Sequence, residues 1–480
     1  MTTVVRTAHH PLYDDLVAIV GPKFVSDDDF VRFAYSMDPS PQLPRVQGIV
    51  VRPGTTQEVS DIVKLANYTR TPVVPSGGRC SLYGLPPGLP GKAIVVDMTR
   101  MRRVLNIDEE NSAVTVEAGI TLAEMATKVQ ERGWDVHTAA QPYYGDTVGG
   151  QLSGVMGGGT GAELTSAGWN THHLYGLKVV LPDGTILQTG TGPGTNTSQR
   201  ITYAREPGSP DITGLFIGDA GIFGIKTEAT YRMYRLPKIR EGWACAFDTF
   251  EDAWRFCKTM ALIEPQPYAM IVMIPPTATL KALMGLKDWL TMCIFKANRE
   301  DEAEWKRAVI KEAVKDAGGR LSDDPASREW VDRAVSLKAH REMGEFASLG
   351  VWTYLELIAP PSEVPECFHF VKSLHEGTLE KNNIPYHSNN GIVSVGGNQW
   401  IITSIIFLEG SDARAMGVMR ELWARGLEMG TERGWFPDAH QGYGTIVIAK
   451  HWSPEVANFM RTLKRALDPN NIMNPGLWSL

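Results

Sequence analysis

The sequence has no long hydrophobic segment. Its longest apolar stretches, at residues 268–276 and 400–408, fall far short of the ~20 residues that a membrane-spanning helix needs. We therefore expect both stretches to be buried strands, and we expect no membrane span. Residues 1–14 also lack the apolar core of a secretory signal peptide. The absence of both features predicts a cytoplasmic protein.

Cysteine and positive charge are scarce as well. The five cysteines are an odd number without any Cys-x-x-Cys spacing, which argues against a disulfide framework and against a zinc site. We expect reduced, mostly buried thiols. The formal net charge is −7 and the basic clusters are short. We expect no surface for nucleic acid or for an anionic membrane, since both would need a basic patch.

The remaining composition is that of an ordinary globular protein. Apolar residues make up 43% and charged residues 21% of the 480 positions, which argues against disorder and predicts two or three domains. Glycine thins out after residue 237, where tryptophan and methionine become frequent. We expect residues 1–237 to form one domain, residues 238–434 an inserted second domain, and residues 435–480 a segment that returns to the first.

Local patterns predict short strands and helices on both sides of this change in composition. The expected strands are 49–52, 72–75, 93–97, 113–117 and 351–359, the expected helices are 55–68, 121–132, 250–262, 301–317 and 412–433, and residues 177–187 form a hairpin. The hairpin turn is Asp183-Gly184, a dipeptide that suits a tight two-residue turn. This mixture predicts an α+β fold.

Three glycine-rich segments follow one another, at residues 76–84, 145–161 and 215–229. The glycine density of the second segment is one that neither a helix nor a strand tolerates. Each segment leaves backbone N–H groups unscreened, so together they are able to line a groove for a pyrophosphate and a flat ring system. The alternative is three unrelated tight turns. No G-x-G-x-x-G follows the first strand and no G-x-x-x-x-G-K-[ST] occurs, which argues against a Rossmann site and a P-loop.

Four ordered motifs resemble those of a known flavoprotein family. The three glycine-rich motifs are Pro75-Ser-Gly-Gly-Arg-Cys-Ser-Leu-Tyr-Gly84, Thr147-Val-Gly-Gly-Gln-Leu-Ser153 with Gly157-Gly-Gly159, and Phe216-Ile-Gly-Asp-Ala-Gly-Ile-Phe-Gly-Ile-Lys-Thr-Glu-Ala229. They are similar to the FAD-binding signature of the vanillyl-alcohol oxidase/p-cresol methylhydroxylase family. The closing Asp468-Pro-Asn-Asn-Ile-Met-Asn-Pro-Gly476 resembles that family's C-terminal signature, most closely in its D-lactate/glycolate dehydrogenase branch.

The resemblance implies a PCMH-type FAD-binding domain of two α+β subdomains, with an inserted α+β cap domain that shapes the substrate pocket. The first glycine segment would wrap the pyrophosphate, while the second and third would hold the isoalloxazine and adenine ends. The residues implied to bind FAD are Pro75, Ser76, Gly77, Gly78, Arg79, Cys80, Ser81, Leu82, Pro142, Asp146, Thr147, Val148, Gly149, Gly150, Ser153, Gly158, Gly159, Gly224, Ile225, Thr227 and Asn474.

Departures from the family pattern bear on how the flavin is attached and on which substrate is used. Arg79 stands where many relatives tether the flavin through a histidine, and Asn398-Gln-Trp400 replaces the linking histidine of the cap. FAD is therefore expected to be non-covalent. Tyr443-Gly-Thr-Ile-Val447 replaces a Tyr–Arg pair that stabilises phenolates. His387-Ser-Asn-Asn-Gly391 keeps one histidine of a metal motif and loses the second, so we expect no metal site.

Oxidation of an alcohol requires a group that takes the hydroxyl proton within one hydrogen bond of the substrate. The candidates are Tyr143, Tyr144, His172, His173, Glu356, His440 and Tyr443. A hydrogen-bonded structural role is the alternative for each histidine, ordinary packing for each tyrosine, and an edge-strand carboxylate for Glu356.

These observations predict a FAD-dependent oxidoreductase that oxidises a small alcohol or 2-hydroxyacid-like substrate by hydride transfer to flavin. The electrons would pass to O2 or to a protein or quinone acceptor. One alternative is oxidation of an aromatic alcohol or alkylphenol. Another is a flavin subunit that passes electrons to an iron–sulfur or cytochrome partner, because the chain has no cluster cysteines of its own. The resemblance also implies a homodimer.

Overall fold

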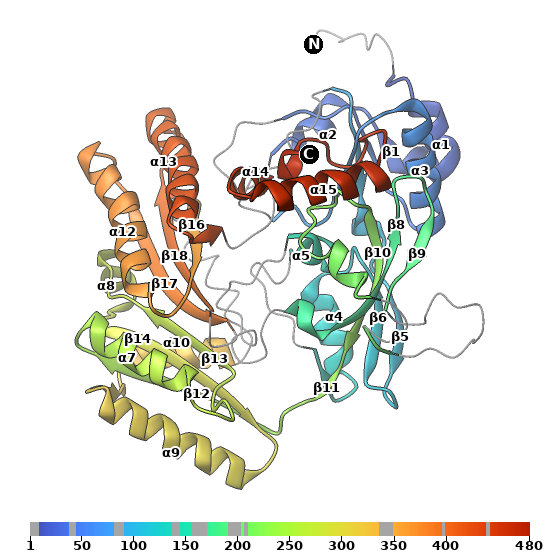
Figure 1. Ribbon diagram of the computed structural model, residues 1–480. Coiled ribbons are helices and arrows are strands. Elements are labelled where there is room, and N and C mark those ends of the chain that lie inside the picture. Colours follow the sequence, from blue (N-terminus) through green and yellow to red (C-terminus); the bar gives the residue numbers. More distant parts are fainter. Residues whose placement is uncertain are drawn as a thin grey trace.

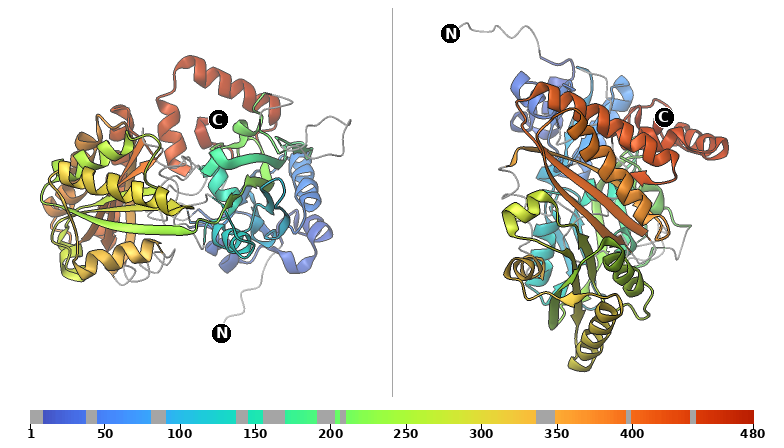
Figure 2. Two further views of the ribbon diagram at one scale, coloured as in Figure 1. Left: turned by 90° about the horizontal axis from the view of Figure 1, so that it is seen from below. Right: turned by 90° about the vertical axis from the view of Figure 1, so that its left-hand side faces the viewer.

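The computed structural model describes residues 9–37, 45–80, 91–136, 145–154, 170–190, 203–205, 210–335, 349–395, 399–437 and 442–480. These residues form two domains that lie side by side (Figure 1). The N-terminal domain holds two sheets, and the inserted domain is built around one large sheet. A view from below shows that the inserted domain extends from one end of the N-terminal domain through a long strand (Figure 2).

The first sheet of the N-terminal domain has the strand order β1-β2-β4-β3 in the described part of the chain. Its strands are β1 (Val25–Ser26), β2 (Ile49–Val51), β3 (Val73–Ser76) and β4 (Ile94–Asp97), and its helices are α1 (Tyr13–Val20), α2 (Asp29–Ala34) and α3 (Thr56–Thr69). β2, β4 and β3 are parallel. Parallel strands bring their carboxyl ends to one edge of a sheet, so β3 and β4 deliver the residues after them to the same place.

The second sheet is antiparallel and has the order β5-β6-β10-β8-β9 among the described strands. Its strands are β5 (Val104–Asp108), β6 (Ala113–Glu117), β8 (Leu174–Val180), β9 (Ile186–Gln188) and β10 (Ile225–Arg232), accompanied by helices α4 (Leu122–Gln130) and α5 (Val148–Gly154). The predicted hairpin turn is confirmed, with Gly184 at a φ of 85°. Each sheet has its own apolar core, which confirms the expected pair of subdomains.

The inserted domain is an antiparallel sheet with the order β15-β12-β14-β13-β17-β18-β16-β19. Its strands are β12 (Ile239–Phe247), β13 (Met270–Ile274), β14 (Trp289–Ala297), β15 (Arg320–Leu321), β16 (Val351–Ala359), β17 (His387–Val395), β18 (Gln399–Leu408) and β19 (Phe436–Pro437). β19 lies two residues beyond the change of composition at residue 434. The chain therefore completes this sheet before it returns to the N-terminal domain.

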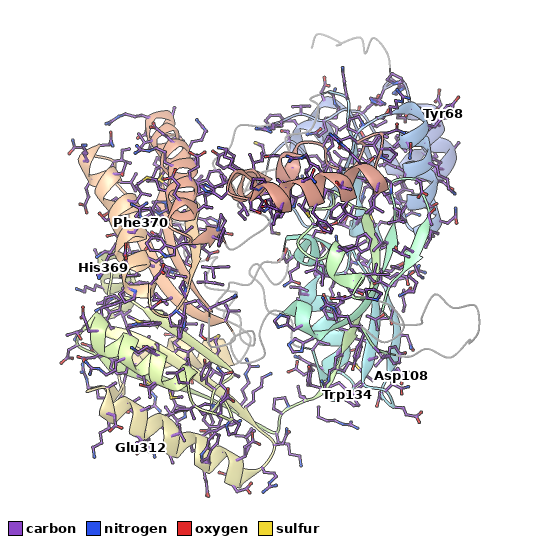
Figure 3. All side chains as sticks on the ribbon, in the orientation of Figure 1. Tyr68, Asp108, Trp134, Glu312, His369 and Phe370 are labelled. Carbon is purple, nitrogen blue, oxygen red and sulfur yellow. The ribbon has the colours of Figure 1, made fainter. Side chains whose placement is uncertain are left out.

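Helices cover both faces of this sheet. They are α7 (Phe250–Ala261), α9 (Glu300–Asp316), α12 (Val364–Lys381) and α13 (Ala413–Glu432) on one face, and α8 (Ala278–Met284) and α10 (Pro325–Val335) on the other. In Figure 1, α12 and α13 lie on the side of β16, β17 and β18 that faces away from the N-terminal domain. Tyr68 on α3 and Glu312 on α9 mark opposite ends of the molecule (Figure 3).

Most predicted elements are present, and one expectation is wrong. β16 has the predicted bounds, and Thr55 caps α3 by accepting a hydrogen bond from the backbone N–H of Glu58. The second glycine segment, however, contains the helix α5. Gly149 lies so close to Ala118 that an added Cβ would be 3.0 Å from the Ala118 Cβ. Tertiary contact thus outweighs the low helix propensity of glycine.

The two domains also meet at an ion pair. Lys296 on β14 lies 2.9 Å from Asp135 on the short strand β7 (Trp134–Asp135), and both side chains are largely buried. β7 pairs with β11 (Tyr234–Arg235), which directly precedes the first strand of the inserted domain. The ion pair therefore lies beside the connection from β11 to β12, where it joins the inserted domain to the N-terminal domain.

The C-terminal segment returns to the N-terminal domain through α14 (Gly442–Lys450), α15 (Pro454–Leu467) and a 3-10 helix (Leu477–Ser479). Its last loop runs beside β3, where Val73 donates to Ile472 O at 2.7 Å and accepts from Asn474 N at 3.0 Å. Lys464 on α15 is buried and lies 2.6 Å from Asp468. Its ammonium also donates to the carbonyls of Ile222 and Met473.

The cysteines and the helix lengths were two further subjects of the sequence analysis. All five cysteines are free, and four of them are buried. None of the described helices is long and apolar enough to cross a bilayer. The cytoplasmic location and the homodimer stay predictions.

Removal of the Asp468 carboxylate should destabilise the fold. In Asp468→Ala the buried Lys464 ammonium loses its counter-charge, and the N–H groups of Ile472 and Met473 lose their acceptor. We expect the free energy of unfolding in urea to fall by about 3–5 kcal/mol. Arg465→Ala, at an exposed position next to Lys464, is the control and should unfold like the wild type. Equal stability of the two variants would contradict the role of the ion pair.

Candidate active site

A pocket with a cavity volume of about 140 Å³ lies in the N-terminal domain where the glycine-rich segments meet. Its described walls are Pro75, Ser76, Gly77, Gly78, Arg79, Cys80, Met98, Ala118, Asp146, Thr147, Gly149, Gly150, Ser153, Ala220, Gly221, Gly224, Ile225, Lys226, Gly442, Asn474 and Leu477. Both sheets and the C-terminal segment therefore contribute to one site.

The first and second glycine segments are in direct contact. A Cβ on Gly77 would lie 2.2 Å from the Thr147 Oγ1, and one on Gly78 would lie 1.8 Å from the Gly145 carbonyl oxygen. Real Cβ atoms do not approach other atoms so closely. These glycines are therefore needed to join two parts of the chain, in addition to any contact that they make with a ligand.

The second segment is fastened to the end of β6. Val148 N donates to Ile120 O at 2.9 Å, and Gly149 N donates to Ala118 O at 2.7 Å. Ser153 Oγ donates back to Gly149 O at 2.8 Å. Because these bonds hold the first turn of α5 against the second sheet, the backbone of Gly149 and Gly150 forms a fixed wall of the pocket.

The third segment is held by buried polar groups. Lys226 Nζ lies 2.6 Å from Asp219 Oδ1, and both side chains are almost fully buried. Asn474 Nδ2 donates to Ala220 O at 2.7 Å, while Gly221 adopts a φ of 74° that favours glycine. Burial raises the pKa of Asp219, although the Lys226 ammonium opposes that shift.

Arg79 and Cys80 line the pocket at the end of the first glycine segment, and neither side chain is suited to covalent attachment. The Arg79 guanidinium lies 4.1 Å from the centre of the Tyr35 ring and donates to the Ala34 carbonyl. Burial, with a further contribution from Asp146, raises the pKa of the Cys80 thiol to about 12. The thiol is therefore protonated at neutral pH, and the protonated form is a weak nucleophile.

Asp146 is the most unusual side chain of the pocket. It is 6% exposed, and its Oδ2 atom is buried without a hydrogen-bond partner. Burial raises the pKa of this carboxyl to about 7. Asn474 likewise has a buried Oδ1 atom without a partner. Buried polar groups are normally hydrogen-bonded, so these two atoms fit a pocket that receives a polar ligand.

The structure brings most of the predicted cofactor-binding residues together. Val148 and Thr227 do not line the pocket; both are fully buried behind its wall. Ser81, Leu82, Pro142, Gly158 and Gly159 lie outside the described residues.

Sequence reasoning missed several residues of the wall. They are Met98, Ala118, Ala220, Gly221, Lys226, Gly442 and Leu477. Ala220, Gly221 and Lys226 belong to the third motif. If every residue of that motif had been taken as a candidate, these three would have been found. Met98 and Ala118 directly follow β4 and β6, so the predicted strand ends could have found them.

The structure places the described proton-acceptor candidates apart from one another. His173 Nδ1 lies 2.6 Å from the Tyr234 hydroxyl, and His172 is exposed. The Tyr443 hydroxyl donates to Glu428 at 2.9 Å. Neither His173 nor Tyr443 is among the residues that line the pocket. Tyr143, Tyr144 and His440 lie outside the described residues.

Glu356 occupies a different position. It is 8% exposed and accepts a hydrogen bond from Thr403 on the neighbouring strand β18. Its sequence neighbours Leu355 and Leu357 pack against α13, and side chains alternate between the faces of a strand. Glu356 therefore points to the opposite face, which in Figure 1 is turned toward the N-terminal domain.

The described residues hold no group of three His, Cys, Asp or Glu side chains arranged for a metal ion. His387, the one histidine kept from the metal motif, is exposed at the start of β17.

Comparisons with known proteins identify a FAD-binding domain in this chain, and solved structures share its fold. The family model described as "FAD binding domain" matches residues 48–190, and "FAD linked oxidases, C-terminal domain" matches residues 441–477. A p-cresol methylhydroxylase structure with bound substrate has a TM-score of 0.80 at 16% identity and covers 98% of this chain and 96% of its own. A 4-ethylphenol oxidase from Gulosibacter chungangensis also has a TM-score of 0.80, at 18% identity, and covers 97% and 96%.

Relatives in sequence match over nearly the whole chain. The glycolate oxidase subunit GlcD of Bacillus subtilis is 25% identical and covers 96% of this chain and 95% of its own length. A D-lactate dehydrogenase of Anaerostipes hadrus is 25% identical and covers 89% and 88%. The chain is an enzyme of the FAD-linked oxidase/dehydrogenase family.

The residues of the pocket fit FAD. Backbone N–H groups of the glycine segments suit a pyrophosphate, and the unpartnered atoms of Asp146 and Asn474 suit polar groups of the cofactor. Residues 76–80, 146–153 and 220–226 would hold FAD from three sides, and Asn474 would close the site. When bound, FAD supplies the capacity to accept a hydride.

Gly78→Ala should weaken flavin binding. Its Cβ would overlap the Gly145 carbonyl, and forcing the two segments apart costs about 1–3 kcal/mol. We expect the affinity for FAD to fall about tenfold or more, which flavin titration of the purified variant measures. Gly417→Ala, where nothing lies within 4 Å of an added Cβ, should bind FAD like the wild type. Unchanged affinity in Gly78→Ala would contradict the close contact.

Proposed function

We propose that this enzyme oxidises a small alcohol or 2-hydroxyacid-like substrate with non-covalently bound FAD. One observation carries the proposal. The match to relatives named glycolate oxidase subunit and D-lactate dehydrogenase includes the inserted domain, since it covers 96% and 89% of this chain. A protein that shared only residues 48–190 and 441–477, the segments matched by the two family models, would match less than half of this chain.

Non-covalent attachment is supported by the side chains at the two possible tethering positions. Arg79 is held by Tyr35 and Ala34, and the thiol of Cys80 is kept protonated by burial. In the inserted domain, residue 399 at the start of β18 is a glutamine, and residue 400 is a fully buried tryptophan. None of these groups is a nucleophile under ordinary conditions.

Oxidation of an alcohol needs a group that takes the proton of the substrate hydroxyl. We assign this role to Glu356. It is buried, it lies on the face of the inserted sheet turned toward the N-terminal domain, and Thr403 orients its Oε1 atom. A carboxylate in this place is able to take the proton of a substrate hydroxyl while the hydride leaves the adjacent carbon.

An aromatic alcohol or alkylphenol is the second candidate substrate. Trp352 and Tyr354 lie at alternate positions of β16 from Glu356, and so on the same face of the strand. Their ring centres are 6.0 Å apart. Two aromatic rings beside a carboxylate suit an aromatic ligand. The electron acceptor is proposed to be O2 or a protein or quinone. One relative is itself named a subunit, which keeps electron transfer to a second polypeptide as an alternative.

The absorption spectrum after acid precipitation tests the attachment. We expect flavin absorbance to leave with the supernatant, because no covalent bond retains it. Anaerobic addition of glycolate, D-lactate or an aromatic alcohol should then bleach the flavin of the untreated enzyme. Flavin that stays with the pellet would contradict non-covalent binding, and bleaching by the aromatic alcohol alone would select the second candidate.

Glu356→Gln should slow flavin reduction without loss of flavin. The amide keeps the shape of the side chain but accepts no proton, and a general base typically contributes about 10²- to 10⁴-fold. Anaerobic stopped-flow measurement of flavin bleaching gives the rate. Tyr443→Phe is the matched control, since the Tyr443 hydroxyl bonds to Glu428, and its rate should stay near that of the wild type. A normal rate in Glu356→Gln would exclude this residue as the base.

A further inference from the structure

We propose that Asp146 binds FAD as a neutral carboxylic acid, so that the bound cofactor holds a proton on this side chain through a hydrogen bond. The proton comes from solvent when FAD binds and returns to solvent when FAD leaves. The acceptor is an oxygen or nitrogen atom of the cofactor, either on the diphosphate or on the flavin ring. The inference requires the FAD-binding pocket and is independent of the substrate class.

The position of Asp146 supports this role. The residue lines the pocket, yet it is 6% exposed and its Oδ2 atom has no hydrogen-bond partner. Its backbone is fixed on both sides, because its carbonyl accepts from Leu122 N at 3.0 Å and Thr147 next to it bridges to Thr121. A buried Oδ2 atom that has no partner in the protein needs a partner in the ligand.

The charged groups around Asp146 leave its charge uncompensated. On the first segment, Arg79 is turned to Tyr35 and Ala34, and Cys80 is a neutral thiol. On the third segment, Lys226 is already paired with Asp219 at 2.6 Å. From the side of the second sheet, Glu124 of α4 caps its own helix and pairs with Arg102. No described cation is therefore available to stabilise an Asp146 carboxylate.

The charge of FAD makes the neutral form necessary. The diphosphate is anionic, and a carboxylate in the same pocket would repel it, whereas a carboxylic acid donates a hydrogen bond to it. Burial alone already raises the pKa of Asp146 to about 7. A bound anion and the loss of the remaining water raise it further. At a pH between the pKa of Asp146 in the free protein and its higher pKa in the complex, FAD binding takes up a proton. The affinity for FAD is therefore constant below about pH 7 and falls above it.

The dissociation constant of FAD as a function of pH tests the inference. Holoenzyme is diluted into buffers from pH 5.5 to pH 9, and released flavin is measured by fluorescence. We expect the wild-type dissociation constant to be level at low pH and to rise by up to tenfold per pH unit above pH 7, the limit for uptake of one proton. In Asp146→Asn, whose amide stays neutral and still donates, the rise should disappear.

Asp248→Asn, an exposed carboxylate paired with Arg320 on the inserted domain, is the control and should keep the wild-type slope. The same slope in Asp146→Asn, or no slope in the wild type, would overturn the inference. Repeating the titration with riboflavin, which lacks the diphosphate, identifies the acceptor. A slope with FAD and riboflavin supports a ring atom, and a slope with FAD alone supports the diphosphate.

A second measurement does not depend on reversible binding of FAD. At pH 8 the infrared spectrum of the wild-type holoenzyme should contain the carbonyl stretch of a buried carboxylic acid that shifts in D2O. This band should be absent from the Asp146→Asn holoenzyme. Its absence from the wild type would overturn the inference even if flavin proved to be covalently attached, whereas covalent attachment itself would contradict only the proposed function.

Discussion

The contact between Gly78 and the Gly145 carbonyl is the constraint on which the site depends. The two residues belong to different subdomains, since Gly78 follows β3 of the first sheet and Gly145 precedes α5, which is bonded to the end of β6 in the second sheet. No Cβ fits between them, so the subdomains meet at backbone distance. The space that remains between the first, second and third glycine segments is the pocket. Its shape is therefore set by main-chain contacts, which vary little with the side chains around them.

The C-terminal segment makes this arrangement dependent on the end of the chain. Met473 pairs with Val73 of β3, and Asn474 donates to Ala220 of the third segment. Lys464 reaches the carbonyl of Ile222 from α15. One short loop thus joins both halves of the pocket after the inserted domain has been completed. Two connections join the inserted domain to the N-terminal domain. One runs from β11 to β12, and the other is the C-terminal segment that begins after β19.

The sequence predicted the motifs well because each depends on residues that are near in the chain. The turn at Gly184 and the strand β16 both follow local rules. The helix α5 did not follow these local rules, because Gly149 lies in close contact with Ala118, a residue distant in the chain. The direction of the Tyr443 hydroxyl was equally unpredictable, since its acceptor Glu428 belongs to a different helix. Residues whose role depends on a distant partner were therefore the ones that sequence reasoning misplaced.

The pocket is lined largely by backbone groups, and this limits which charged side chains it accepts. Backbone groups of the glycine segments would hold the cofactor, so a buried charge in the pocket needs a partner within the protein. Lys226 and Asp219 satisfy this condition by pairing with each other. Asp146 has no such partner, and a buried unpaired carboxylate is costly enough that the group takes up a proton instead. The electrostatic potential of the pocket is thus governed by a protonation equilibrium that the backbone contacts themselves create, because they hold the carboxyl away from water.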